Sequence, residues 1–175
     1  MLPAFAALPP SVAVACDTRR VPAIHPLCLE LQKTWFAEIP LVAALALEVV
    51  DYTDEGELRV KAPLAPNRNV HGTAFAGSLF SVCVLTGWGS TWLALKLAGL
   101  DGSIVVSESR IQYRKAVAGE IVCACRPDRA VLATSLEDLR AHGRANLPLV
   151  CTVDAGGKRA VAFEGTYVVH APSRS

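Results

Sequence analysis

The feature that most restricts the fold of this chain is an uncharged stretch of 22 residues, from Ala74 to Leu95. A run of about 20 apolar residues is long enough to cross a bilayer, so a membrane span is one interpretation. Against it, the stretch contains five Ser or Thr residues and three glycines, and no cluster of Lys or Arg flanks either end. The sequence therefore predicts one long helix buried in a folded protein.

Length and composition define the class of protein. With 175 residues, of which 52% are hydrophobic, the chain is long enough for one domain with a substantial core. The formal net charge of +1 gives no general electrostatic reason to bind nucleic acid. We therefore expect neither a nucleic-acid partner nor a membrane.

The first 24 residues differ from the rest of the chain. They contain four prolines, and the basic pair Arg19 and Arg20 follows the apolar part, whereas a signal peptide carries its basic residues first. We interpret residues 1–24 as a loosely ordered tail and residues 25–171 as the folded domain.

Strand-like segments precede and follow the long helix in the sequence. Charged and apolar residues alternate from Leu58 to Ala62, as in a half-buried strand. Asp128 can cap a helix that ends near Gly143. The full set of expected elements is a helix from Pro26 to about Ala37, a hairpin of 41–52 with 58–62, the long helix, strands at 103–117 and 121–126, a helix at 128–142, and a hairpin of 147–153 with 159–170. The order predicts an α+β fold with a mainly antiparallel sheet, in which the 15-residue strand is central and partly at an interface.

Six cysteines show neither a CxxC pair nor a His at metal-ligand spacing. Cys123 and Cys125 are two residues apart and so would share one face of a strand. We expect free thiols in a reducing cytoplasm, no metal site and no bound cofactor.

The segment NVHGTAFAGSL at residues 69–79, with SESRIQYR at 107–114, resembles a known family. It is similar to the hotdog-fold thioesterase domain found at the C-terminus of some bacterial acetyltransferase-like proteins, and the likeness covers roughly residues 25–170. The resemblance implies a curved sheet wrapped around one long helix, and hydrolysis of an acyl thioester carried by coenzyme A or acyl-carrier protein. It also implies a homodimer or a dimer of dimers, with the active site at the subunit boundary and the strand through Tyr113 as the joining edge.

Thioester hydrolysis needs donors for the oxyanion that forms when water attacks the carbonyl. Unpaired N–H groups at a helix N-terminus supply such donors, and the dipole there favours negative charge. The first turn of the long helix would provide them from Ala76, Gly77 and Ser78. The alternative is that these small residues only let the sheet pack closely.

A general base is harder to find. Phenylacetyl-type hotdog thioesterases have a pattern similar to Asn-x-x-Gly-Thr-x-His-Gly-Gly, with an acidic residue nine positions beyond the His. In this chain Phe75 stands at the His position and Val84 at the acid position. The replacements we consider are Asn69, which could orient a water or hold the carbonyl, and His71, which titrates near neutrality. Each could equally serve only the structure of its loop.

The substrate-binding candidates divide into apolar and polar residues. Phe75 and Leu79 could line an acyl slot, although their spacing is also ordinary for helix packing. Arg114 could meet coenzyme phosphates, and Glu108 aligns with an acidic strand residue of the relatives, although a surface ion pair would also explain it. Tyr113 completes this set. Cys83, deep in the apolar helix, is expected to be a core residue.

Two other functions stay open at this level. A non-catalytic acyl-CoA-binding module would keep the slot and the helix N-terminus but would lack a base. A hotdog dehydratase would need a His and an acid facing each other across the site, and only His71 is placed for the first role.

Overall fold

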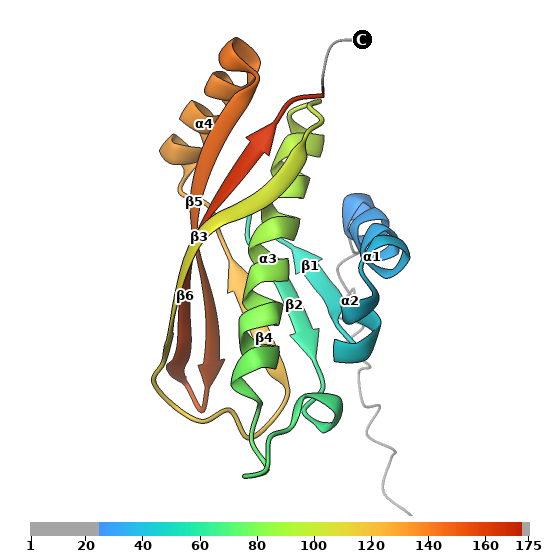
Figure 1. Cartoon of the computed structure of the whole chain (residues 1–175), viewed down its shortest axis with the longest axis vertical. Coiled ribbons are helices and arrows are strands. Elements are labelled where there is room, and N and C mark those ends of the chain that lie inside the picture. Colours follow the sequence, from blue (N-terminus) through green and yellow to red (C-terminus); the bar gives the residue numbers. More distant parts are fainter. Residues whose placement is uncertain (1–24, 173–175) are drawn as a thin grey trace, which may run out of the picture.

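A six-stranded antiparallel sheet curves around one long helix in the computed structural model, which describes residues 25–172 (Figure 1). The strand order is β1-β2-β4-β5-β6-β3. The elements, in chain order, are α1 (Pro26–Glu38), α2 (Pro40–Leu45), β1 (Glu48–Tyr52), β2 (Leu58–Ala62), the 3-10 turn η1 (Ala65–Asn67), α3 (Ala76–Leu97), β3 (Ser103–Tyr113), β4 (Ile121–Cys125), α4 (Arg129–His142), β5 (Arg144–Ala155) and β6 (Lys158–His170). The predicted α+β architecture is confirmed. The predicted tail, residues 1–24, lies outside the described residues.

Helix α3 lies in the core because large side chains pack against it from both sides. Tyr167 on β6 and Trp35 on α1 are fully buried. Two glycines allow this close approach: a Cβ atom at Gly87 would lie 2.5 Å from Tyr167 Cζ, and one at Gly89 would lie 2.6 Å from Trp35 Cζ2. The Tyr167 hydroxyl also donates a hydrogen bond to the Val84 carbonyl, with an O···O distance of 2.9 Å. Gly87 and Gly89 therefore serve packing.

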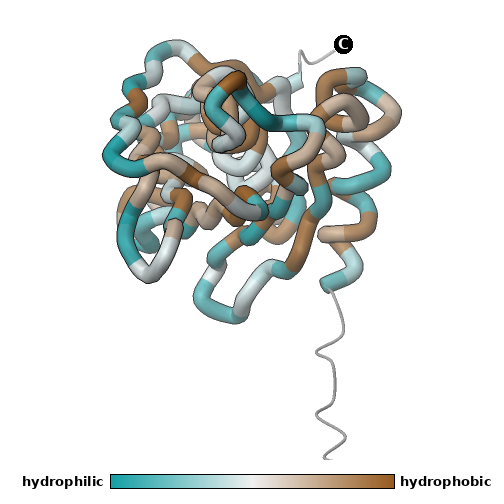
Figure 2. Tube along the Cα trace, turned by 90° about the horizontal axis from the view of Figure 1, so that it is seen from below, coloured by the Kyte–Doolittle hydropathy of each residue, from teal (hydrophilic) through white to brown (hydrophobic). Residues whose placement is uncertain are grey.

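The hydrophobicity of α3 is explained by the same packing. By length and composition α3 could cross a membrane, yet 67% of its most apolar window is buried inside the protein. Figure 2 views the molecule from the end at which α3 begins, and many of the outer turns are hydrophilic. This is the pattern of a core helix.

The two edge strands of the sheet differ in what covers them. The Gln32 side chain on α1 accepts from Val49 N at 2.6 Å and donates to the Leu47 carbonyl at 3.1 Å, and so it covers the β1 edge as a neighbouring strand would. Strand β3 forms the opposite edge and pairs only with β6 among the described strands. The prediction of a central strand at 103–117 is therefore wrong for the single chain, and the strand has 11 residues.

The segment 41–52 is also not a single strand. Residues Pro40–Leu45 form the short helix α2, which ends at Ala46 in the left-handed conformation, and only Glu48–Tyr52 pairs with β2. Proline at the first helical position and the alanines that follow favour a helical turn. The capping signals of α4 are confirmed, since Asp128 accepts from two backbone N–H groups and Gly143 ends the helix at a φ of 67°.

Four buried thiols lie between α3 and the sheet. Cys123 and Cys125 share the inner face of β4, as predicted, Cys151 lies opposite Cys125 on β5, and the Cys123 and Cys83 sulfurs are 3.8 Å apart. Contact with the Cys123 thiol and burial raise the pKa of Cys83. Cys83 is thus a core residue, as expected.

Candidate functional site

The loop that leads into α3 is organised by the side chain of Asn69. Its Oδ1 accepts from the backbone N–H of His71 at 2.9 Å and of Thr73 at 3.2 Å, and its Nδ2 donates to Thr73 Oγ1 at 3.0 Å and to the Ala74 carbonyl at 3.3 Å. Asparagine commonly holds turns in this way. These bonds fix the path of residues 69–74 just before the helix.

A second asparagine, Asn67, anchors the same loop to the core and was not predicted as a functional residue. Its side chain is buried and donates to the carbonyls of Leu45 and Pro63 at 2.9 and 2.8 Å. Its own carbonyl accepts from Phe75 N at 2.7 Å. Asn67 thereby sets the position at which α3 begins. The signal in the sequence was weak, because an Asn after a proline is also typical of an exposed turn.

The first turn of α3 presents unpaired donors. Phe75 is the N-cap and supplies no side-chain acceptor, and the N–H groups of Ala76, Gly77 and Ser78 have no acceptor among the described residues. The next amide, of Leu79, bonds to the Phe75 carbonyl at 3.0 Å. No acidic residue lies in this turn, so no carboxylate of the turn itself compensates the positive end of the helix dipole.

A cleft of about 330 Å³ lies beside this turn. Its walls come from the approach loop, from α3 and from the segment that follows β3. Tyr113, the last residue of β3, crosses it: its hydroxyl donates to the Ala76 carbonyl at 3.0 Å. The residues that line the cleft are Asn69, Thr73, Ala74, Ala76, Leu79, Tyr113, Arg114, Lys115, Ala116 and Val117.

The structure brings most of the predicted site residues to one place. Asn69, Ala76, Leu79, Tyr113 and Arg114 line the cleft together. The other predicted members of the first turn, Gly77 and Ser78, are partly exposed next to it. Their catalytic roles stay predictions, but the predicted neighbourhood is present.

Phe75 lies over the first turn of the helix and does not line the cleft. A Cβ atom at Gly77 would overlap Phe75 Cε1 and lie 3.0 Å from Cζ, so the ring lies directly on the glycine. The side chain is 54% exposed, which leaves it free to move. Glycine at position 77 is therefore explained by contact with the neighbouring ring.

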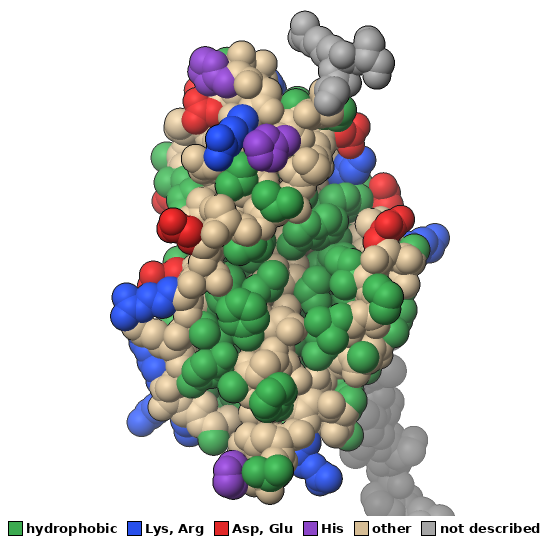
Figure 3. Space-filling model, viewed as in Figure 1, with side chains coloured by type: hydrophobic (Ala, Val, Ile, Leu, Met, Phe, Trp, Pro, Cys, Tyr) green, Lys and Arg blue, Asp and Glu red, His purple; other side chains and the backbone are tan. Residues whose placement is uncertain are grey.

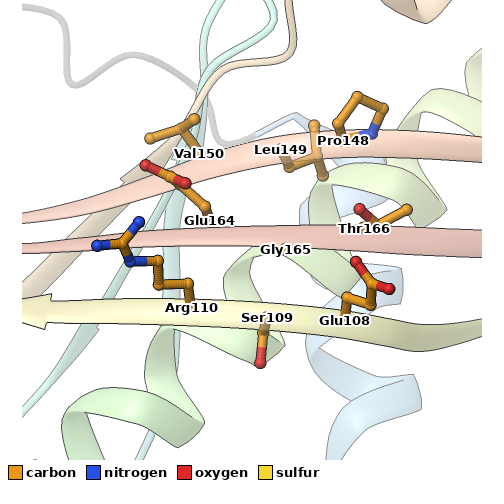
Figure 4. Close-up of a pocket in the computed structure, with 9 residues that line it drawn as sticks. All are labelled: Glu108, Ser109, Arg110, Pro148, Leu149, Val150, Glu164, Gly165 and Thr166. Carbon is orange, nitrogen blue, oxygen red and sulfur yellow. The ribbon is translucent and has the colours of Figure 1, made fainter.

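Glu108 and His71 lie away from the cleft. Glu108 pairs with Thr166 on the outer face of the sheet, where it borders a shallow groove with Arg110 and Glu164, while Ser109 points to the other side (Figure 4). His71 is exposed, and its backbone N–H bonds to Asn69. Substrate binding by Glu108 and a role of His71 as a base stay predictions that this placement does not support.

A model of the family described as "Putative thioesterase (yiiD_Cterm)" matches residues 28–171. The chain belongs to this thioesterase family. A Shewanella oneidensis protein of the same description is 36% identical, with a TM-score of 0.77, and the match covers 83% of this chain and 98% of that one. A Chlorobaculum tepidum protein of unknown function is 27% identical, with a TM-score of 0.78 over 83% of this chain and 95% of that one. The fold is the hotdog fold of these thioesterases, as the resemblance implied.

A more distant structure agrees on the fold alone. A Pseudomonas aeruginosa protein described as a "probable thioesterase" is 23% identical, with a TM-score of 0.67, and the match covers 82% of this chain and 96% of that one. At this identity the likeness concerns the arrangement of helix and sheet.

The cleft of this thioesterase-family chain offers donors and cations but no general base. No Asp, Glu or His of residues 25–172 lines it. Burial, with a smaller contribution from Cys83, raises the pKa of Tyr113, which keeps the phenol protonated. Arg114 and Lys115 bond to uncharged oxygens, of Gln112 and Ala155 respectively. In the same part of the chain, no three His, Cys, Asp or Glu side chains are grouped to hold a metal ion.

We expect Asn69→Ala to lower the free energy of unfolding by about 1–2 kcal/mol, because two backbone N–H groups lose their acceptor. Asn69→Asp keeps an acceptor for both N–H groups but places an oxygen opposite the Ala74 carbonyl, so it should recover only part of the stability. Urea unfolding of the three proteins measures the difference. Equal stability of the alanine variant and the unchanged protein would contradict the role of Asn69 in holding the loop.

Proposed function

We propose that the protein hydrolyses an acyl thioester of coenzyme A or acyl-carrier protein, with the oxyanion held at the N-terminus of α3. The observation that carries this proposal is the set of three unpaired N–H groups beside an open cleft in a member of a thioesterase family. Donors placed where charge develops are a large term in acyl transfer.

The reaction assigns a role to each side of the cleft. A water oxygen attacks the thioester carbonyl carbon, and the carbonyl oxygen becomes an oxyanion facing the first turn of α3. The carbon–sulfur bond then breaks, and one proton of the water goes to the sulfur, which leaves as a thiol. The other proton of the water is released to solvent, so that the acyl group leaves as a carboxylate. Arg114 and Lys115, with no carboxylate in the cleft wall, suit the phosphate groups that both carriers possess.

A homodimer is part of the proposal. Strand β3 has a free edge within residues 25–172, and unpaired strand edges are otherwise an aggregation hazard. Helices α1, α2 and α3 also expose large hydrophobic side chains, namely Phe36, Leu41 and Phe80, and α3 lies at one face of the molecule (Figure 1). Figure 3 shows this face as a broad hydrophobic area with charged side chains mainly at its rim. A second copy paired along β3 would cover both features, and a dimer of dimers could form from such pairs.

The second copy is also where we place the missing base. Tyr113 is both the last residue of β3 and a wall of the cleft, so a strand added to β3 would border the cleft. Sedimentation at micromolar concentration should give twice the mass of the chain. A monomer at all concentrations would overturn the homodimer and, with it, this source of the base.

The five described cysteines are free and buried, and these thiols suit a reducing compartment such as the cytoplasm. We therefore place the enzyme there.

A panel of acyl-CoAs of increasing chain length, assayed with a thiol-reactive dye, tests the reaction. We expect thiol release that depends on chain length. Binding of acyl-CoA without thiol release would instead support a non-catalytic binding module, which the absence of a base from the cleft favours as the second candidate. Hydration of an enoyl thioester would indicate a dehydratase.

A further inference from the structure

One peptide unit connects Tyr113 to the proposed oxyanion donors. The carbonyl of Ala76 and the N–H of Gly77 belong to the same planar, conjugated peptide group. Tyr113 donates to that carbonyl at 3.0 Å, and the Gly77 N–H on the other side has no acceptor among residues 25–172. The hydroxyl, the peptide group and the free N–H therefore form a chain of donors that ends at the first turn of α3.

Hydrogen bonds in such a chain reinforce one another. A donor at a carbonyl oxygen draws electron density from the peptide nitrogen, which makes the N–H of that peptide a stronger donor, by about 10–30% per bond in condensed phase. Two contacts hold Tyr113 in place: β3 pairs it with Val161, and its hydroxyl bonds to the first turn of α3. Its hydroxyl is protonated at neutral pH, as any tyrosine with an ordinary pKa of about 10 is, and burial raises the pKa of Tyr113 further.

We infer that Tyr113 is a positioning residue that strengthens the Gly77 N–H as an oxyanion donor through the Ala76–Gly77 peptide. This inference rests on the proposed thioester hydrolysis, and it gives the tyrosine a function other than contact with substrate. The same bond ties the end of β3 to the first turn of α3, 37 residues away in the sequence.

The chain supplies a matched control in Tyr167. Its hydroxyl also donates to a carbonyl of α3, that of Val84 at 2.9 Å, but in the middle of the helix. There the next N–H, of Leu85, is inside the helix, where the regular bonding pattern pairs it. Tyr167→Phe therefore removes a bond of the same kind without touching a free donor. We expect it to lower thermal stability and to leave kcat unchanged.

Tyr113→Phe should lower kcat about fivefold at unchanged KM, as expected for the loss of one hydrogen bond that matters mainly in the transition state. In the nitrogen-15 NMR spectrum without substrate, the resonance of the Gly77 amide nitrogen should move upfield, because the carbonyl of that peptide has lost its donor. The phenylalanine ring keeps the ring-current environment, so the shift reports the hydrogen bond. Placing 3-fluorotyrosine at position 113, a stronger donor, should raise kcat above that of the unchanged protein.

The outcomes separate this inference from the proposed function. If the unchanged protein releases thiol and Tyr113→Phe has the same kcat and the same Gly77 shift, the inference is overturned and the hydrolase stands. If Tyr113→Phe lowers kcat but 3-fluorotyrosine at position 113 does not raise kcat above that of the unchanged protein, Tyr113 has only a structural role. That result would also overturn the inference. If the unchanged protein hydrolyses no thioester, the proposed function fails, and the Gly77 shift alone then decides whether Tyr113 polarises the peptide.

Discussion

Gly77→Val is expected to lower turnover by about a hundredfold while the protein remains folded. Removal of one oxyanion donor typically costs a factor of about 10²–10³ in kcat. A side chain at position 77 would overlap the ring of Phe75, which is half exposed and would move across the first turn of α3. The valine and the displaced ring would then cover the free N–H groups.

Kinetics on the best substrate of the acyl-CoA panel measure this effect. Gly119→Val is the control, because a Cβ there meets nothing within 4 Å, and turnover should be unaffected. The double variant Phe75→Ala with Gly77→Ala removes the ring that a Cβ would meet, and it should recover much of the turnover that Gly77→Ala loses. A fully active Gly77→Val protein would reject the first turn of α3 as the oxyanion site.

Gly87→Ala should give the largest loss of stability, up to about 3 kcal/mol. The new methyl group would lie 2.5 Å from Tyr167 Cζ, and the fully buried ring would have to shift from its place between α3 and β6. Overpacking a core costs about 1–3 kcal/mol, and the hydrogen bond from Tyr167 to Val84 would be lost as well, about 1 kcal/mol more. The better helix propensity of alanine returns about 1 kcal/mol.

Urea unfolding monitored by circular dichroism measures the change. Gly119→Ala serves as the control for a glycine that has open space around it. If Tyr167→Phe combined with Gly87→Ala recovers part of the loss, the clash with the hydroxyl oxygen is identified as its source. A Gly87→Ala protein as stable as the unchanged one would mean that the ring packs against α3 more loosely than the structure has it.

Much of the architecture could be predicted because it depends on local signals. The uncharged run from Ala74 to Leu95 predicted the core helix, which is Ala76–Leu97 in the structure. The alternating residues of β2 and the caps Asp128 and Gly143 placed further elements, since a strand's two faces and a helix's unpaired ends impose residue preferences within a few positions. The short helix α2 was missed because six residues carry too little periodicity to distinguish a helix from a strand.

The candidate site was predictable only in part. The motif indicated Asn69 and the first turn of α3 through the chemistry of small residues and free N–H groups. The cleft wall also needs Tyr113 and Arg114, which reach it only because β3 ends beside the start of α3. Glu108 was placed with them in the prediction, but the register of β3 against β6 puts it on the outer face.

The sequence by itself thus determined most of the elements and the existence of one buried helix with a small, polar approach loop. Only the tertiary structure decided that β3 is an edge strand, that Asn67 joins α2 to the start of α3, and that a tyrosine 37 residues away bonds to the first helical carbonyl. The physical reason is the distance along the sequence over which each interaction acts. Backbone propensities and caps act over a few residues, whereas these contacts depend on the strand order of the whole sheet and on how its curvature surrounds the helix.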